Sequence, residues 1–106
     1  MVYVNGMHAP YSILRCFNST LAGAAATTPP CGVNFLELAT GIGHWSFDFG
    51  FQVDDRFYST TLGEEYDILT AIVAAASLAS DPNKVYVDTV DSNGNGKGDY
   101  FTLIVF

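Results

Sequence analysis

The clearest pattern along the chain is a strict alternation of apolar and polar residues between positions 45 and 54. Five apolar side chains occupy every second position, with small or polar side chains between them: Trp45, Phe47, Phe49, Phe51 and Val53. A period of two is typical of a strand that buries one face. We therefore expect one long strand here, in which Gly50 marks a bulge or a bend.

Shorter runs of apolar and β-branched residues predict further strands. These runs are 2–4, 11–17, 33–39, 84–90 and 100–106. The last run is apolar on both faces, which indicates a strand that is central and covered on both sides or that lies at an interface. Residues 18–32 contain Pro29-Pro30 and are expected to form a mobile surface loop, in which the alanine run allows one helical turn.

The segment that follows residue 60 predicts the one main helix. Thr61 and Glu64 fit a capping box, with Thr61 as the N-cap. Apolar residues then recur at helical spacing, which is typical of an amphipathic helix. They are Ile68, Leu69, Ile72, Val73, Ala75, Ala76 and Ala79. We expect a helix over about 64–80, ended by Asp81-Pro82-Asn83.

Together these elements predict an α+β fold with the order β-β-β-α-β-β. This order suits a five-stranded OB-like barrel. The alternative is a small antiparallel sheet of five to six strands with the helix on one face. The 106 residues are expected to form a single domain, 1–106, because two domains would leave neither half enough chain for a core.

Composition and charge narrow the classes of function. Hydrophobic residues make up 49% of the chain, which argues against disorder. The chain has 11 Asp and Glu against 4 Lys and Arg, a net charge of −7. A nucleic-acid partner and an anionic membrane surface are therefore not expected, because both require a basic face. The sequence as given shows no signal peptide, so we expect a cytoplasmic protein.

The two cysteines, Cys16 and Cys31, leave two alternatives. A bond between them would close a loop of about 16 residues and contribute roughly 3 kcal/mol on a chain-entropy estimate. Reduced and packed thiols are favoured, because an export signal is not seen and cytoplasmic thiols stay reduced.

The segment 91–99 is the sharpest candidate for an ion site. Oxygen-bearing side chains occupy its loop positions 1, 3, 5 and 9: Asp91, Asn93, Asn95 and Asp99. With Gly96 at position 6, this spacing resembles the calcium loops of EF-hand and dockerin proteins. Position 12 is Thr102 instead of an acidic residue, so any Ca²⁺ binding is expected to be weak. The alternative is a flexible hairpin loop whose Asn-Gly pairs form turns. No other cofactor is expected.

A second candidate site surrounds the aromatic strand. Its residues are His44, Trp45, Asp48, Asp55 and Arg56. Ring faces flanked by carboxylates suit a cationic or sugar ligand, and His44 has the chemistry of a general base. In the alternative interpretation the aromatic residues form the core, Asp48 is solvated and residues 54–56 form a charged turn.

The layout of the second half resembles a known family. The aromatic strand around Phe47-Asp48-Phe49, the alanine-rich segment 66–79, and the runs at 85–87 and 100–106 look like the B subunits of pertussis-like and subtilase-type bacterial toxins. The resemblance implies an OB-type barrel, ring assembly and glycan binding. A mobile-gene-cassette protein that shares only this layout is an equally good interpretation.

These observations favour a non-enzymatic binding or interaction module that forms a homo-oligomer. The main reason is the last strand, whose two apolar faces need covering. One alternative is an acidic protein of the antitoxin or immunity type that neutralises a basic protein partner. Another is a protein or enzyme that binds a small molecule or a cation through residues 44–56.

Overall fold

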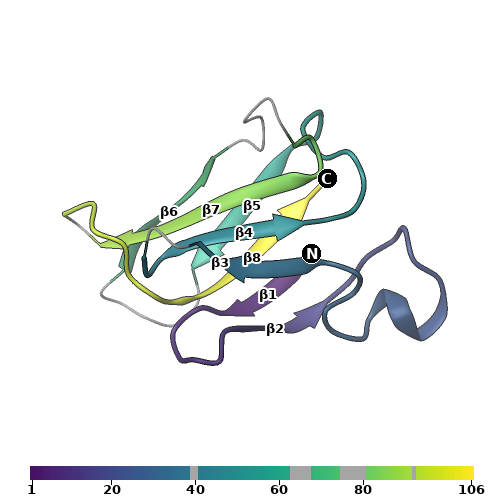
Figure 1. Ribbon diagram of the computed structural model, residues 1–106, viewed down its shortest axis with the longest axis horizontal. Helices are drawn as coiled ribbons and strands as arrows, with labels where there is room; N and C mark the ends of the chain where they lie inside the picture. The colour runs from purple at the N-terminus through teal and green to yellow at the C-terminus, as the bar shows by residue number, and fades with distance from the viewer. Residues whose placement is uncertain (39–40, 63–67, 75–80, 92) are drawn as a thin grey trace.

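The computed structural model describes residues 1–38, 41–62, 68–74, 81–91 and 93–106, and these residues form eight strands and one short 3-10 helix (Figure 1). The strands are β1 (Val2–Asn5), β2 (Ser12–Cys16), β3 (Asn34–Glu37), β4 (His44–Asp48), β5 (Tyr58–Leu62), β6 (Ile68–Ala74), β7 (Lys84–Asp91) and β8 (Tyr100–Val105). The helix η1 covers Gly23–Ala26.

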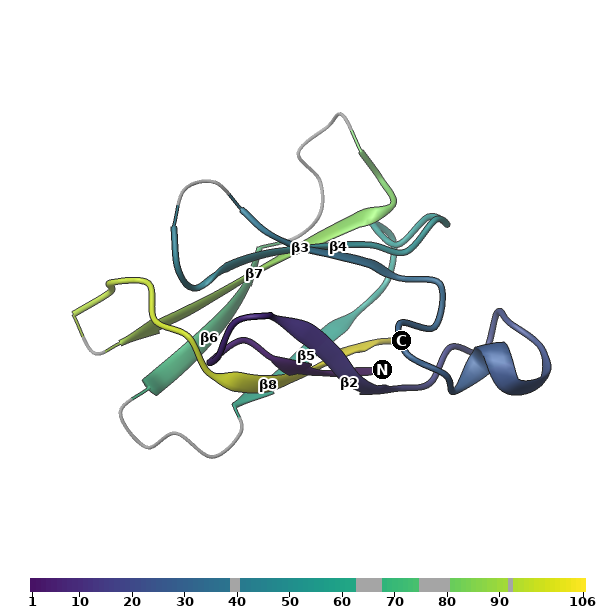
Figure 2. The same ribbon diagram turned by 60° about the horizontal axis from the view of Figure 1, so that its bottom comes forward.

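The strands form two antiparallel sheets that pack face to face. One sheet has the order β2-β1-β8-β5 and the other β3-β4-β7-β6. Figure 2 shows the two sheets as separate layers. The edge strands β5 and β6 lie against each other, so the two layers meet along one side. The architecture is therefore a β-sandwich, and the α+β and OB-like predictions are wrong.

The core lies between the central strands of the two sheets. Trp45 and Phe47 of β4 are fully buried, as are Phe101 and Leu103 of β8. The Trp45 and Phe101 ring centroids are 6.1 Å apart, and Phe47 packs edge-on against Phe101 at 6.0 Å. Burying each such side chain stabilises the fold by roughly 1.5–3 kcal/mol. These residues join the two layers.

The predicted helix over 64–80 is wrong. Residues 68–74 form strand β6, which pairs with β7 from Ile68–Asp91 to Ala74–Tyr86. Four of the seven residues are β-branched (Ile68, Thr70, Ile72 and Val73), and β-branched residues favour a strand when a partner is available. Thr61, the predicted N-cap, belongs to strand β5. The rest of the predicted helix, 64–67 and 75–80, lies outside the described residues.

The long aromatic strand predicted over 45–54 is shorter in the structure. Strand β4 ends at Asp48, and Gly50 turns the chain with a φ of 73°. The Asp48 carboxylate stabilises this turn by accepting a hydrogen bond from Gly50 N at 3.0 Å. Beyond the end of the strand, Phe49 and Val53 are still buried, whereas Phe51 is half-buried. The alternation therefore identified most of the buried residues but not the length of the strand.

The other predicted strands are confirmed with small changes in their ends, and one strand was not predicted. The missed strand is β5, Tyr58–Leu62, whose sequence Tyr-Ser-Thr-Thr-Leu contains little apolar signal. Strand β8 is central, between β1 and β5. Sheet β3-β4-β7-β6 covers its Phe101 face, and the ring of Tyr3 covers part of the other face by stacking on Tyr100 at 6.2 Å.

Cys16 and Cys31 form a disulfide, so the prediction of reduced thiols is wrong. The buried side chain of Asn18 holds the two segments together, because its Nδ2 donates to Cys31 O at 2.8 Å. The segment between the cysteines contains helix η1 at the alanine run. In the part of the chain that the structure describes, no helix has the length and apolar character needed to cross a membrane.

Candidate functional site

A pocket of about 210 Å³ lies at the end of the sandwich where β1 begins and β8 ends. Its walls are mostly apolar, and the residues that define them are Phe17, Phe49, Phe51, Arg56, Ile104 and Val105. Two other hollows, of about 310 and 490 Å³, are more open to solvent. The apolar pocket is therefore the best candidate for a ligand site.

The turn after β4 forms one wall. Gly50 reverses the chain direction, so that Phe49 and Phe51 pack against each other at 5.9 Å between ring centroids. Arg56 lies on this wall with its guanidinium carbon 5.4 Å from the centroid of Phe51. Its Nε donates to Gln52 O at 3.3 Å. A cation over an aromatic face is stabilised by the ring quadrupole, which holds the guanidinium beside the apolar surface.

The segment after β2 forms the opposite wall. Asn18 Oδ1 accepts hydrogen bonds from the Thr20 backbone N at 3.0 Å and from Thr20 Oγ1 at 2.6 Å. With its bond to Cys31 O, the Asn18 side chain thus has three hydrogen bonds. The disulfide fixes the same segment from the other side, and Cys31 lines the pocket. Both walls are therefore held in place without a ligand.

The charge of the pocket is opposite to that of the protein. The chain carries 11 acidic side chains, yet the lining contains Arg56 and none of those acidic side chains among the described residues. Met1 also lines the pocket, and its α-amino group donates to Phe17 O at 2.8 Å. Burial lowers the pKa of this amino group. A negatively charged ligand would meet positive charge in this pocket.

Three exposed aromatic residues line the pocket or follow its lining residues in the sequence. Phe17 lines it and is 54% exposed. Phe57 and Phe106 adjoin the lining residues Arg56 and Val105, and they are 82% and 66% exposed. Their backbones are joined by a hydrogen bond from Phe106 N to Phe57 O at 2.9 Å. Three large apolar side chains on or next to the lining are therefore left in contact with solvent.

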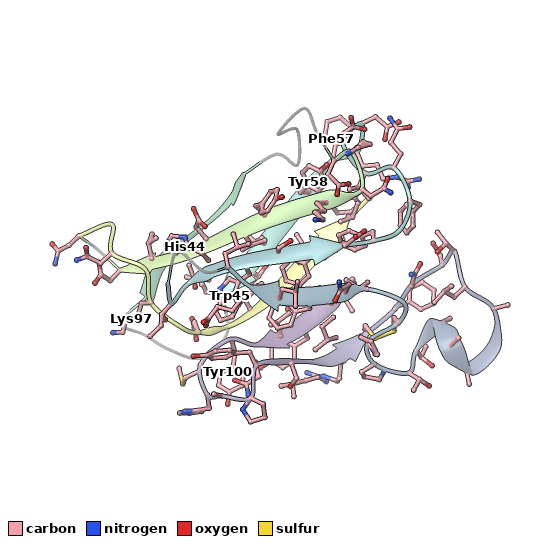
Figure 3. The ribbon with its side chains drawn as sticks, in the orientation of Figure 1. His44, Trp45, Phe57, Tyr58, Lys97 and Tyr100 are labelled. Atoms are coloured by element: carbon pink, nitrogen blue, oxygen red, sulfur yellow. A yellow bond between two sulfur atoms is a disulfide. The ribbon has the colours of Figure 1, made fainter. Side chains whose placement is uncertain are left out.

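The second candidate site of the sequence is divided between two ends of the molecule. His44 lies at the end near Lys97, whereas Phe57 and Tyr58 lie toward the opposite end (Figure 3). His44 pairs across the strands with Asp88 of β7, with 2.8 Å between His44 Nδ1 and Asp88 Oδ1. The partner of the His44 ring is therefore a carboxylate of the neighbouring strand and not a residue of the predicted site.

The remaining residues of that candidate site have separate roles. Trp45 is fully buried, so its ring faces pack in the core instead of facing a ligand. Asp48 bonds to the Gly50 turn, and Asp55 is exposed. Only Arg56 reaches the pocket. The other pocket residues were missed, because Phe17 follows β2 and Ile104 lies in β8, and these distant segments are brought together by the strand order β2-β1-β8.

In the candidate calcium loop, the Asp91 carboxylate bonds to its own backbone. Its Oδ1 accepts hydrogen bonds from Asn93 N at 2.9 Å and Asn95 N at 3.1 Å, as in an Asx turn. Asp99 is fully buried, and its Oδ1 accepts from Tyr100 N at 2.7 Å. Within the described ranges, no group of three or more His, Cys, Asp or Glu side chains could hold a metal ion. Calcium binding stays a prediction.

Tyr58 lies in the strand that follows the pocket wall. Its hydroxyl donates to Val53 O and so ties β5 to the buried end of the turn. Burial, with smaller effects from Asp54 and Asp55, raises the pKa of this hydroxyl above its ordinary value. Tyr58 therefore supports the wall that carries Arg56 instead of acting as an acid near neutral pH.

Comparison with known proteins gives no independent guide to this site, since no protein-family model, no curated protein and no solved structure matches the chain.

Proposed function

We propose that this protein is a non-enzymatic binding module that holds a small apolar molecule in the pocket beside Phe17, Phe51 and Val105. The observation that carries the proposal is the preformed apolar pocket of about 210 Å³. For comparison, an engineered apolar cavity of about 150 Å³ binds benzene. The pocket thus has room for one ring or a short acyl chain, and it is smaller than a typical drug-sized site of about 300 Å³ or more.

The test is a titration with phenylacetamide, a neutral single-ring probe, followed by two-dimensional NMR of the backbone amides. Ligands of this size bind weakly, so we expect saturation in roughly the millimolar range. Saturable shifts should centre on Phe17, Phe51 and Val105. No saturable shift up to the solubility limit of the probe would rule out the proposal.

A pocket-filling variant makes the test specific. In Val105→Phe the added ring occupies the pocket, and the probe should no longer bind. The matched control is Leu14→Phe, which adds a ring at an exposed position of β2 away from the pocket and should leave binding unchanged. Both variants must show a wild-type melting profile. Retained binding in a folded Val105→Phe protein would place the probe elsewhere.

A second candidate function, self-association, is favoured by the exposed pair Phe57 and Phe106. A homo-oligomer would cover these rings. Light scattering at tens of micromolar should then give a mass above that of one chain, and Phe57→Ser with Phe106→Ser should return the mass to one chain. A monomeric wild-type protein at this concentration would end this candidate.

A further inference from the structure

We infer that the ligand of this pocket is a small apolar monoanion, a carboxylate attached to one aromatic ring or to a short acyl chain. The ring or chain would lie among Phe17, Phe49 and Phe51, and the carboxylate would bind the guanidinium of Arg56. This inference rests on the proposed function and adds the chemical class of the ligand.

The distribution of charge favours an anionic ligand over a cationic or a neutral one. Acidic side chains outnumber basic ones by 11 to 4 over the whole chain, yet the basic residue Arg56 is the charged side chain that lines the pocket in the described part of the protein. A cationic ligand would find no carboxylate in that lining to pair with. A neutral ligand would fill the apolar volume and could accept a hydrogen bond from the guanidinium, but it would lack the charge-assisted, two-oxygen contact that a carboxylate makes.

The guanidinium of Arg56 has capacity for a further partner. Within the described residues its side chain makes one hydrogen bond, from Nε to Gln52 O at 3.3 Å, and no ion pair closer than 4.0 Å. A guanidinium has five N–H donors, and two parallel donors match the two oxygens of a carboxylate. Its stacking on Phe51 limits its motion, so a carboxylate would meet a partly ordered donor.

The acidic residues next to Arg56 limit how much the negative charge of the ligand can improve its affinity. Asp54 and Asp55 precede Arg56 in the exposed turn, and Asp54 Oδ1 accepts a hydrogen bond from Gln52 Nε2 at 2.8 Å. Their negative field weakens the attraction of a second anion. The site is also partly open to water, which screens charge. We therefore expect the charge of the ligand to improve its affinity by roughly three- to tenfold.

The experiment compares phenylacetate with phenylacetamide, which share ring and shape but differ in charge. In the wild type, phenylacetate should bind roughly three- to tenfold more tightly. Arg56→Gln should remove this difference by weakening phenylacetate alone. The matched control is Arg15→Gln, which removes the arginine that lies 5.0 Å from the Tyr3 ring, outside the pocket, and should keep the difference. Raising the ionic strength from 0.05 to 0.3 M shortens the Debye length from about 14 Å to about 6 Å, and it should lower the affinity for phenylacetate only.

The outcomes separate this inference from the proposed function. Equal affinity for both probes in the wild type, with binding abolished in Val105→Phe, would overturn the anionic class and leave the pocket as a neutral binding site. A preference for phenylacetate that survives Arg56→Gln would also overturn the inference. Failure of both probes to bind would remove the proposed function itself. Unchanged melting curves for Arg56→Gln and Arg15→Gln confirm that folding is not the cause.

Discussion

The indole N–H of Trp45 donates to the Thr89 hydroxyl at 3.2 Å, and that hydroxyl donates in turn to Lys97 O at 2.6 Å. Trp45 and Thr89 are both fully buried. The backbone makes the same connection, because Lys97 N donates to Thr89 O at 2.9 Å. Thr89 thus supplies the acceptor for the indole N–H of Trp45, the largest core side chain, and it fixes the loop that leads from β7 to β8.

We predict that Thr89→Val destabilises the protein by about 1–3 kcal/mol, because the buried indole N–H loses its acceptor while the side-chain volume stays the same. Urea unfolding followed by Trp45 fluorescence measures this change. Thr102→Val is the control, since it makes the same replacement at a half-buried position of β8 and should stay within about 0.5 kcal/mol of wild type. Equal effects of the two variants would contradict the role of Thr89.

Gly43 and Gly94 both have positive φ, 87° and 80°, but they differ in the space around them. A Cβ on Gly43 would lie 2.4 Å from Thr89 O, whereas a Cβ on Gly94 would meet nothing within 4 Å. Gly94→Ala should cost about 1 kcal/mol from backbone strain alone. Gly43→Ala should cost about 3–5 kcal/mol, because the clash with the backbone adds to the strain. Thermal unfolding of the two variants side by side checks the ranking, and the reverse order would refute it.

Reduction of the disulfide between Cys16 and Cys31 should lower the free energy of unfolding by about 3 kcal/mol, the chain-entropy value for a loop of about 16 residues. The same reduction should weaken probe binding, because Cys31 lines the pocket. Urea unfolding with and without a phosphine reductant measures the change. The double variant Cys16→Ala, Cys31→Ala is the control and should not respond to the reductant. An equal response in that variant would show an effect unrelated to the disulfide.

Tyr58→Phe should cost about 1 kcal/mol at pH 7, because the hydrogen bond to Val53 O is lost. The pKa of Tyr58 is raised in the folded state, mainly by burial. The neutral phenol therefore stabilises the fold fully below about pH 10, its unfolded value, and this contribution is lost as the pH rises through the folded-state pKa. Urea midpoints at pH 7, 9 and 10.5 should show the gap between wild type and Tyr58→Phe closing at the highest pH. A constant gap would contradict the assignment.

The sequence predicted which residues are buried more accurately than it predicted the type and bounds of the secondary-structure elements. The alternation from Trp45 to Val53 correctly identified core residues on both sides of the Gly50 turn. It did not show where the strand ends, because apolar and polar residues continue to alternate through the turn. The two-faced run at 100–106 predicted a strand that is central and covered on both sides or that lies at an interface, and β8 is central in its sheet.

The errors came from segments whose local sequence pattern fits a helix but which pair with another strand in the structure. The apolar run of β6 fits a helical period as well as a strand, and pairing with β7 decides between them. Thr61 fits an N-cap, yet in β5 it pairs with Thr102 of β8. Both partners are distant in sequence, so local preference could not identify them.

The candidate site was harder to predict than the fold. The sequence predicted Arg56 as part of the second candidate site, and the structure does place it in the pocket. His44, predicted in the same site, lies at the other end of β4, because a strand separates its ends by about 3.3 Å per residue. The partners that replace His44 are apolar residues such as Phe17 and Ile104, which carry no chemical signal of a site.

The position of β8 has a consequence for how the chain folds. β8 lies between β1 and β5, so the first and the last strand of the described chain are neighbours and β5 has no partner in its sheet until β8 arrives. A nascent chain therefore cannot complete this sheet until synthesis has passed Val105. Contacts between such distant segments slow folding, and sandwiches of this kind fold in roughly milliseconds to seconds. During that interval the edges of β1 and β5 are open to pairing with other chains, the kind of contact from which aggregation of folding intermediates starts.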